Sequence, residues 1–206
     1  MPANRILRWT LAVVTVVALL GIGFIGGLLK PTLSRPGTNS ADAGFARDMS
    51  THHAQAVGMA MLEVENGSDP AVRELALDIA LTQQAQIGQM TVWLQDWHLL
   101  PTSTKTPMSW MPGGPVQLVN GLMPGMASVD QVNELTAARG KQSDILFCQL
   151  MLRHHLGGIH MVEGILQLTH NSQVRDLANT MLSGQQGEVL VLQNELKTLG
   201  AQPLTS

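Results

Sequence analysis

The stretch FARDMSTHHAQAVGM (residues 45–59) recurs in altered form as FCQLMLRHHLGGIHM (residues 147–161). At this offset of 102 residues, the leading phenylalanine, the paired histidines and the flanking methionines coincide. The register continues downstream without a gap and gives twelve identities in all. Paired histidines flanked by methionine are rare, so their recurrence at a fixed offset indicates an internal duplication. The fold is therefore expected to consist of two copies of one helical hairpin.

Turn and cap residues mark the ends of four long helices. We expect the first hairpin over residues 42–98, with helices over 43–65 and 70–98 separated by an Asn-Gly-Ser turn and an Asp69 cap. The second hairpin is expected over residues 143–199, with helices over 143–169 and 172–199 and with Gly200 as the stop. Helices of this length with short turns favour antiparallel packing. The sequence thus predicts an all-α fold, a four-helix bundle.

One face of the second helix carries its apolar side chains at helical spacing and is predicted to be buried. Its members are Leu75, Ile79, Thr82, Gln86, Met90, Trp93 and Trp97.

Residues 99–142 between the hairpins are rich in proline, glycine and methionine and are expected to form an irregular connection. The connection contains Met-x-x-Met pairs at residues 108–111 and 123–126. Ser128 and Gln131 have the spacing of a capping box, which predicts one short helix that ends at Gly140. Residues 200–206 remain as a tail.

The amino-terminal segment has 21 consecutive uncharged residues between Arg8 and Lys30. As a helix this run spans about 31 Å, enough to cross the hydrocarbon core of a bilayer. We predict a single-pass transmembrane anchor at residues 1–30 and a linker at residues 31–41, with the bundle facing outside the cytoplasm. The alternative is a cleaved signal peptide, which also places the bundle outside the cytoplasm.

Charge and cysteine content exclude several partners and sites. From Asp42 onward the chain has 15 acidic and 8 basic side chains, which argues against binding to nucleic acid. Cys148 is the single cysteine, so the chain has neither an intrachain disulfide nor a Cys-x-x-Cys metal site. We interpret Cys148 as a core thiol, with a soft metal ligand as the alternative.

The duplicated motif places sulfur and imidazole on one helix face, because each residue advances about 100° around a helix. Thioether and imidazole together form a soft to borderline donor set, which suits copper, above all Cu(I). Zinc would accept the histidines but would gain little from methionine. The predicted metal ligands are Met49, His52, His53 and Met59 in the first copy and Met151, His154, His155 and Met161 in the second.

Two other interpretations of these residues stay open. The methionines are also ordinary core fillers, and the histidines could be hydrogen-bonded core residues of an envelope scaffold. A metal-dependent redox enzyme is a weaker third option, because the chain has no Glu-x-x-His pair, nucleophile elbow, phosphate loop or dinucleotide fingerprint. The polar pairs Gln83-Gln84 and Gln185-Gln186 could hydrogen-bond the histidines, or half of them could simply be solvated.

Three motifs together resemble the bacterial domain-of-unknown-function family 305. They are Met-x-x-His-His followed by small residues and Met, Asp-Pro-x-Val-Arg-x-Leu-Ala at residues 69–76, and the Gln-Gln pair. The resemblance covers about residues 42–199. It implies a ferritin-like four-helix bundle that is exported or membrane-anchored, and it implies copper binding or copper tolerance through the eight residues above. The sequence departs from the family at Ala54-Gln55-Ala56, where an acidic residue or glycine is common, and it lacks a Met-rich tail.

The sequence therefore predicts a non-enzymatic, membrane-anchored protein that binds a metal ion outside the cytoplasm, with copper as the preferred ion. Its expected partners are the membrane and the metal ion, nucleic acid is excluded, and a homo-oligomer is compatible with the sequence.

Overall fold

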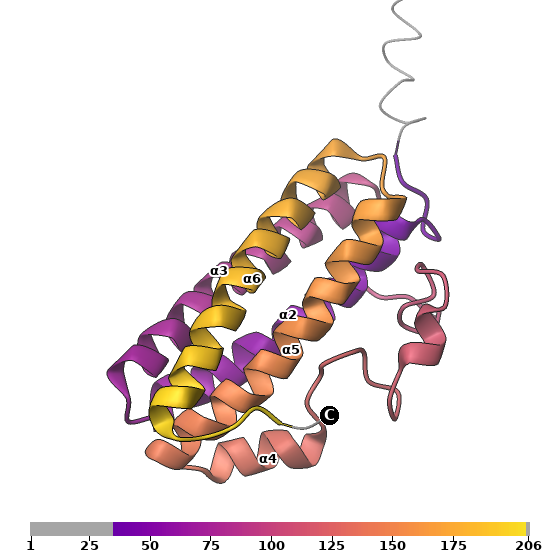
Figure 1. Cartoon of the computed structure of the whole chain (residues 1–206). Helices are drawn as coiled ribbons and strands as arrows, with labels where there is room; N and C mark the ends of the chain where they lie inside the picture. Colours follow the sequence, from indigo (N-terminus) through magenta and orange to yellow (C-terminus); the bar gives the residue numbers. More distant parts are fainter. Residues whose placement is uncertain (1–34, 205–206) are drawn as a thin grey trace, which may run out of the picture. The chain divides into compact units, whose positions relative to one another are not determined.

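The computed structural model describes residues 35–204, and residues 37–204 belong to one compact unit. Its four long helices are α2 (Ala41–Asn66), α3 (Pro70–Asp96), α5 (Lys141–Leu168) and α6 (Ser172–Leu199). α2 packs against α3 and α5 packs against α6, so each half of the unit is a helical hairpin (Figure 1). α2 also packs against α5 and joins the hairpins. Residues 35–204 contain no β-strand, so the predicted all-helical bundle is confirmed for this part of the chain.

The central helices α2 and α5 run antiparallel. Asp42, at the start of α2, accepts a hydrogen bond from Thr169, just past the end of α5. Glu63, near the end of α2, accepts one from Ser143 near the start of α5, over 2.6 Å. Polar contacts at both ends therefore fix the register between α2 and α5, and with it the position of one hairpin along the other.

The turns of the two hairpins are built in the same way. Asp69 caps α3 and Asn171 caps α6, and in each turn the side-chain oxygen accepts from the backbone N–H groups two and three residues further on. Four residues after each cap, Arg73 or Arg175 donates to a carbonyl of the preceding helix. The duplication seen in the sequence is therefore repeated in the local hydrogen bonding.

Several predicted helix ends shift by a few residues. α3 ends at Asp96 rather than at residue 98, because His98 adopts the left-handed conformation (φ 58°). Gly140 does not end the short helix, but is the N-cap of α5, which therefore starts two residues earlier than predicted. At the other end of the bundle, Gly200 is left-handed (φ 73°) and ends α6 as expected.

The buried face of α3 differs from the predicted one by one position. Thr82 is exposed and Gln83 is buried instead, which corresponds to a rotation of about 100° around the helix. Leu75 and Gln86 are only half-buried, whereas the rest of the predicted face is buried, namely Ile79, Met90, Trp93 and Trp97. The predicted face was therefore right for the apolar residues and wrong for Thr82.

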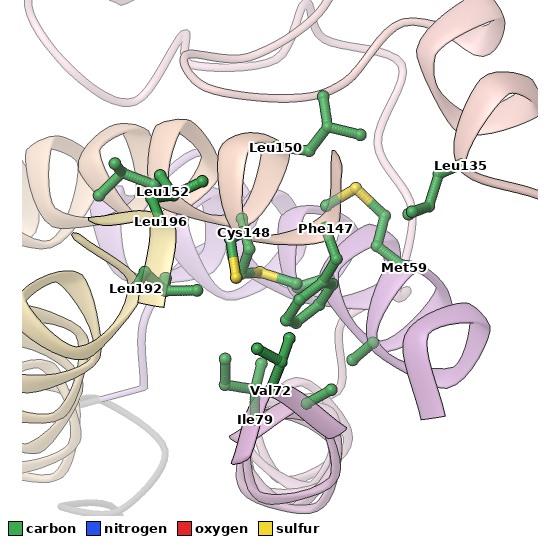
Figure 2. Packing of buried hydrophobic residues seen from close by; sticks show 14 of the residues in the cluster. Met59, Val72, Ile79, Leu135, Phe147, Cys148, Leu150, Leu152, Leu192 and Leu196 are labelled. Atoms are coloured by element: carbon green, nitrogen blue, oxygen red, sulfur yellow. The ribbon is translucent and has the colours of Figure 1, made fainter. Parts of the chain in front are cut away.

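Cys148 lies in the hydrophobic core of the bundle. Figure 2 shows its thiol near Phe147 of the same helix and near Leu192 and Leu196 of the facing helix α6. Burial raises the pKa of this thiol above its ordinary value, which keeps it protonated. The position agrees with the core-thiol interpretation of the sequence.

The connection between the hairpins is mostly irregular, as expected. It contains a 3-10 turn, η1 (Gly114–Gln117), and one short helix, α4 (Val129–Ala137), which begins with the predicted capping box of Ser128 and Gln131. The helix ends at Ala137, before the predicted stop at Gly140.

The predicted membrane anchor at residues 1–30 lies outside the described residues. Among the helices of residues 35–204, none combines the length and the apolar character needed to cross a membrane.

Candidate metal centre

The predicted metal ligands are all interior residues. Each has at most 1% of its surface exposed, and all come from α2 and α5, the two helices that join the hairpins. These residues are Met49, His52, His53, Met59, Met151, His154, His155 and Met161. Folding thus brings both histidine pairs to one helix–helix interface.

His52 and His154 meet across this interface. Their ring centroids are 3.7 Å apart and the rings are inclined by 33°. His154 Nε2 lies 3.1 Å from the carbonyl oxygen of His52, and His52 Nε2 lies 3.0 Å from that of Pro124. A carbonyl oxygen only accepts, so both Nε2 atoms carry the proton and donate.

His53 and His155 bond instead to the outer helix of their own hairpin. His53 Nε2 lies 2.7 Å from Gln86 Oε1, and His155 Nε2 lies 2.5 Å from Glu188 Oε2. Gln86 and Glu188 are themselves related by the offset of 102 residues. These equivalent bonds were missed by the sequence analysis, although the shared offset was a signal that could have found them.

These hydrogen bonds decide which nitrogen of each ring could bind a metal. When Nε2 carries the proton of a neutral imidazole, Nδ1 presents a lone pair. Nδ1 of His52, His53 and His155 is buried and has no hydrogen-bond partner among residues 35–204. A ring whose far nitrogen donates to a carbonyl or carboxylate is the usual state of a metal-binding histidine.

Burial also keeps the rings of His52, His53 and His154 in the neutral form that metal ligation requires. It lowers the pKa of His52 to about 4 and that of His53 to about 3. It lowers the pKa of His154 well below its ordinary value, and the neighbouring histidines lower it further. At pH 7 these three histidines are therefore uncharged bases.

The polar glutamine pairs divide between the interior and the surface. Gln83 and Gln185 are buried, whereas Gln84 and Gln186 are exposed, and none of the four bonds to a histidine in the described chain. Gln83 Oε1 and Gln185 Nε2 are buried without a hydrogen-bond partner in residues 35–204. Of the two interpretations, the one in which half of these glutamines are solvated agrees with the structure, and Gln86 and Glu188 bond to the histidines instead, one helical turn further on.

A family model described as "Domain of unknown function (DUF305)" matches residues 42–196. The chain belongs to the DUF305 family. A solved DUF305 protein from Streptomyces coelicolor, whose description proposes that it is secreted, is 39% identical and superposes with a TM-score of 0.77. That match covers 82% of this chain and 100% of the other. A DUF305 fragment from Deinococcus radiodurans is 31% identical, with a TM-score of 0.64, over 78% of this chain and 95% of the fragment.

The DUF305 chain also shares its fold with a protein named CopM. The Cu(I)-bound form of CopM is 20% identical, with a TM-score of 0.59, over 76% of this chain and 96% of CopM. The Cu(II)-bound form is 21% identical, with a TM-score of 0.62, over 77% and 97%. No curated protein matches the chain.

The four methionines predicted as metal ligands in the DUF305 protein belong to two separate hydrophobic core clusters. Met49 and Met161 belong to one cluster, and Met59 and Met151 belong to the other. Each cluster thus combines one motif methionine from α2 with one from α5, because these helices run antiparallel. Further thioethers join the first cluster, namely Met90, Met108, Met123 and Met181.

The connecting segment Met123–Ala127 covers the facing rings of His52 and His154 at the surface of α2 and α5. The Pro124 carbonyl accepts from His52, and Gln55 exchanges two hydrogen bonds with the Ala127 backbone, at 2.9 and 2.7 Å. A Cβ at Gly157 would lie 2.0 Å from the Pro124 oxygen, so only glycine admits the segment here. The Met-Pro-Gly-Met sequence thus supplies a backbone partner for histidine, a role not expected from the sequence.

The donors at this site are imidazole and thioether rather than carboxylate. No group of three or more His, Cys, Asp and Glu side chains within residues 35–204 is arranged to hold a metal ion. A metal held here would therefore need the methionine sulfurs or glutamine amides beside the imidazoles. Thioether and imidazole ligands favour copper over magnesium, calcium or manganese.

Proposed function

We propose that this DUF305 protein binds copper inside its bundle, through the histidine pairs and the motif methionines. The observation that carries the proposal is the set of buried Nδ1 atoms of His52, His53 and His155, unpartnered within the described residues. Each unsatisfied buried polar group costs about 1–3 kcal/mol, and a bound ion would remove that cost. The Nε2 bonds hold each of these rings in the tautomer that leaves Nδ1 as the base.

The ion is proposed from the donor set. Sulfur from methionine adds affinity for Cu(I) but little for zinc, and the rings of His52, His53 and His154 are neutral. The copper-bound forms of CopM, a protein of the same fold, support the choice of copper. We further propose that the protein has no catalytic activity and acts in copper binding or copper tolerance, as a ferritin-like bundle.

The bundle is proposed to lie outside the cytoplasm, attached to the cell membrane by residues 1–30. The run of uncharged residues there and the proposed secretion of the Streptomyces coelicolor relative support this location. The excess of acidic side chains supports the absence of a nucleic-acid partner.

Competition for Cu(I) tests the proposed function. The full-length protein in detergent is titrated with Cu(I) against a chelator, next to a variant in which His52, His53, His154 and His155 are all changed to glutamine. We expect the wild-type protein to take copper from the chelator and the variant to bind fewer copper ions. His170→Gln, which changes an exposed histidine, serves as the control. Equal Cu(I) affinities of the wild-type protein and the fourfold variant would rule the proposal out.

An envelope scaffold without metal is the second candidate function. It is favoured by the bonds that His52 and His154 make to backbone carbonyls, which hold the two hairpins and the connecting segment together. In that case the substitutions would lower the free energy of unfolding by the same amount with and without copper. A metal-binding protein would in addition lose the stabilisation that copper adds, so its loss would be larger with copper than without.

A further inference from the structure

A second group of metal-binding side chains lines a cleft on the outside of α5, away from the histidine pairs. The cleft has a volume of about 180 Å³ and lies between α5 and the loop that precedes η1. Its polar and sulfur-containing lining residues are Met111, His160, Glu163 and Gln167. A thioether, an imidazole, a carboxylate and an amide thus face one small space.

His160, which lines this cleft, uses its Nε2 in a hydrogen bond, as the buried histidines do. Its Nε2 lies 2.7 Å from Gln117 Oε1 in η1, so Nε2 donates and Nδ1 keeps its lone pair. His160 is nine residues beyond Met151, which places it about 180° around the helix from the buried motif. It is therefore independent of the histidine pairs.

Met111 reaches the cleft because residue 164 is glycine. A Cβ at Gly164 would lie 2.5 Å from the Met111 sulfur, so any larger residue would push the thioether away from α5. Glu163 precedes this glycine and is exposed, whereas His160 and Met111 are half-buried. The sulfur is thus held against the helix turn that carries the imidazole and the carboxylate.

The cleft is not a remnant of the duplication. At the offset of 102 residues, His160, Glu163 and Gly164 correspond to Gly58, Met61 and Leu62 in the first half. That half has no imidazole or carboxylate at these positions, and its exposed methionine is on the helix itself. The donor group therefore belongs to the second half alone.

We propose that this cleft is a second metal site, which captures a copper ion at the surface through Met111 sulfur, His160 Nδ1 and the Glu163 carboxylate. It rests on the proposed function only for the choice of copper as the ion. One thioether, one imidazole and one carboxylate accept copper in either oxidation state. The half-exposed position lets the ion exchange with solvent, unlike the buried histidine pairs.

Methionine methyl resonances test this site separately from the buried one. The full-length protein, labelled with ¹³C at the methionine methyl groups, is titrated with Cu(I) without oxygen, and the resonances are assigned by Met→Leu variants. We expect the Met111 methyl to shift at low Cu(I), whereas Met61, the exposed methionine of the first half, stays in place. Loss of one ligand should weaken binding at least about tenfold, so His160→Gln and Glu163→Gln should each move the Met111 transition to higher Cu(I).

The two proposals fail in different ways in this experiment. If Met111 and Met61 shift together, or if Met111 does not respond to His160→Gln, the cleft is not a site. If Met49 and Met151 shift but Met111 does not, the surface site is ruled out and the buried site stands. If Met111 shifts and the buried methionines do not, the surface site stands and the buried one is ruled out. Circular dichroism of each variant checks that it is folded.

Discussion

The two halves of the bundle share their histidines but not the residues around them. His53 donates to the neutral amide of Gln86, whereas His155, at the equivalent position, donates to the carboxylate of Glu188. A carboxylate partner makes the ring a stronger base and ligand than an amide does. The comparison teaches that duplication kept the imidazoles while the halves diverged in the strength of the ligands they offer.

Removal of the buried phenylalanines gives the largest expected effect and asks whether the halves are equally important for stability. Phe45 and Phe147 are equivalent and fully buried, so Phe→Ala at either should cost about 3–5 kcal/mol. Phe45 also makes an edge contact with Trp110, at 5.7 Å between ring centroids, which Phe147 lacks among the described aromatic pairs. Phe45→Ala should therefore cost more, by about 0.5–1.5 kcal/mol. Urea unfolding measures both, and equal losses would contradict the asymmetry.

Gly157→Ala tests the contact between α5 and the connecting segment. The added methyl would meet the Pro124 carbonyl, so we expect a loss of about 1–3 kcal/mol in the free energy of unfolding. Gly58→Ala is the matched control in α2, because nothing lies within 4 Å of a Cβ there. That substitution should stabilise the helix by up to about 1 kcal/mol. Similar melting temperatures for the two variants would show that the connecting segment can move away from the added methyl group without loss of stability.

Exchange of the histidine partners tests the difference between the halves directly. Glu188→Gln gives the second half the partner of the first and should weaken copper binding about 10- to 100-fold. Gln86→Glu makes the opposite exchange and should strengthen binding. Competition with a Cu(I) chelator measures both affinities. If neither variant changes the affinity, the carboxylate does not tune the ligand.

A buried carboxyl group of the first half makes the stability depend on pH. Burial, together with the nearby Asp144, raises the pKa of Glu63 to about 8, whereas the equivalent residue of the second half is Ile165. Between the ordinary pKa of 4.5 and about 8, the folded state holds a proton that the unfolded state has lost. Stability should therefore fall as pH rises through this range and level off above it.

Glu63→Gln should remove that fall, because an amide does not titrate. Urea unfolding at pH 5.5 and pH 8.5, on the wild-type protein and the variant, measures the difference. An equal change with pH in both proteins would mean that Glu63 is not the titrating group.

Local signals predicted most of the fold. Asp69, Ser128 and Gly200 each end or begin a helix through bonds to nearby backbone, so sequence spacing is enough to find them. The burial of the eight motif residues also followed from their helical spacing. Thr82 was wrongly predicted to be buried, because the edge of a buried helix face depends on how much of that face the neighbouring helices cover.

The partners of the histidines could not be predicted in the same way. Pro124 is 72 residues from His52, and Gln86 is 33 residues from His53, so their contacts depend on the register between packed segments. Helical spacing says which face a residue shares, but it does not say which turn of the neighbouring helix stands opposite. The metal-binding role of the eight residues stays a prediction.

The antiparallel pairing of α2 with α5 means that one hairpin holds only half of the site. A lone hairpin has one ring of the His52–His154 stack and one motif methionine of each core cluster. An ancestral single-hairpin protein would have completed the arrangement only by dimerising with an identical molecule about a two-fold axis. With both hairpins in one chain, the two copies are always paired and need not be identical, as the different residues Gln86 and Glu188 show.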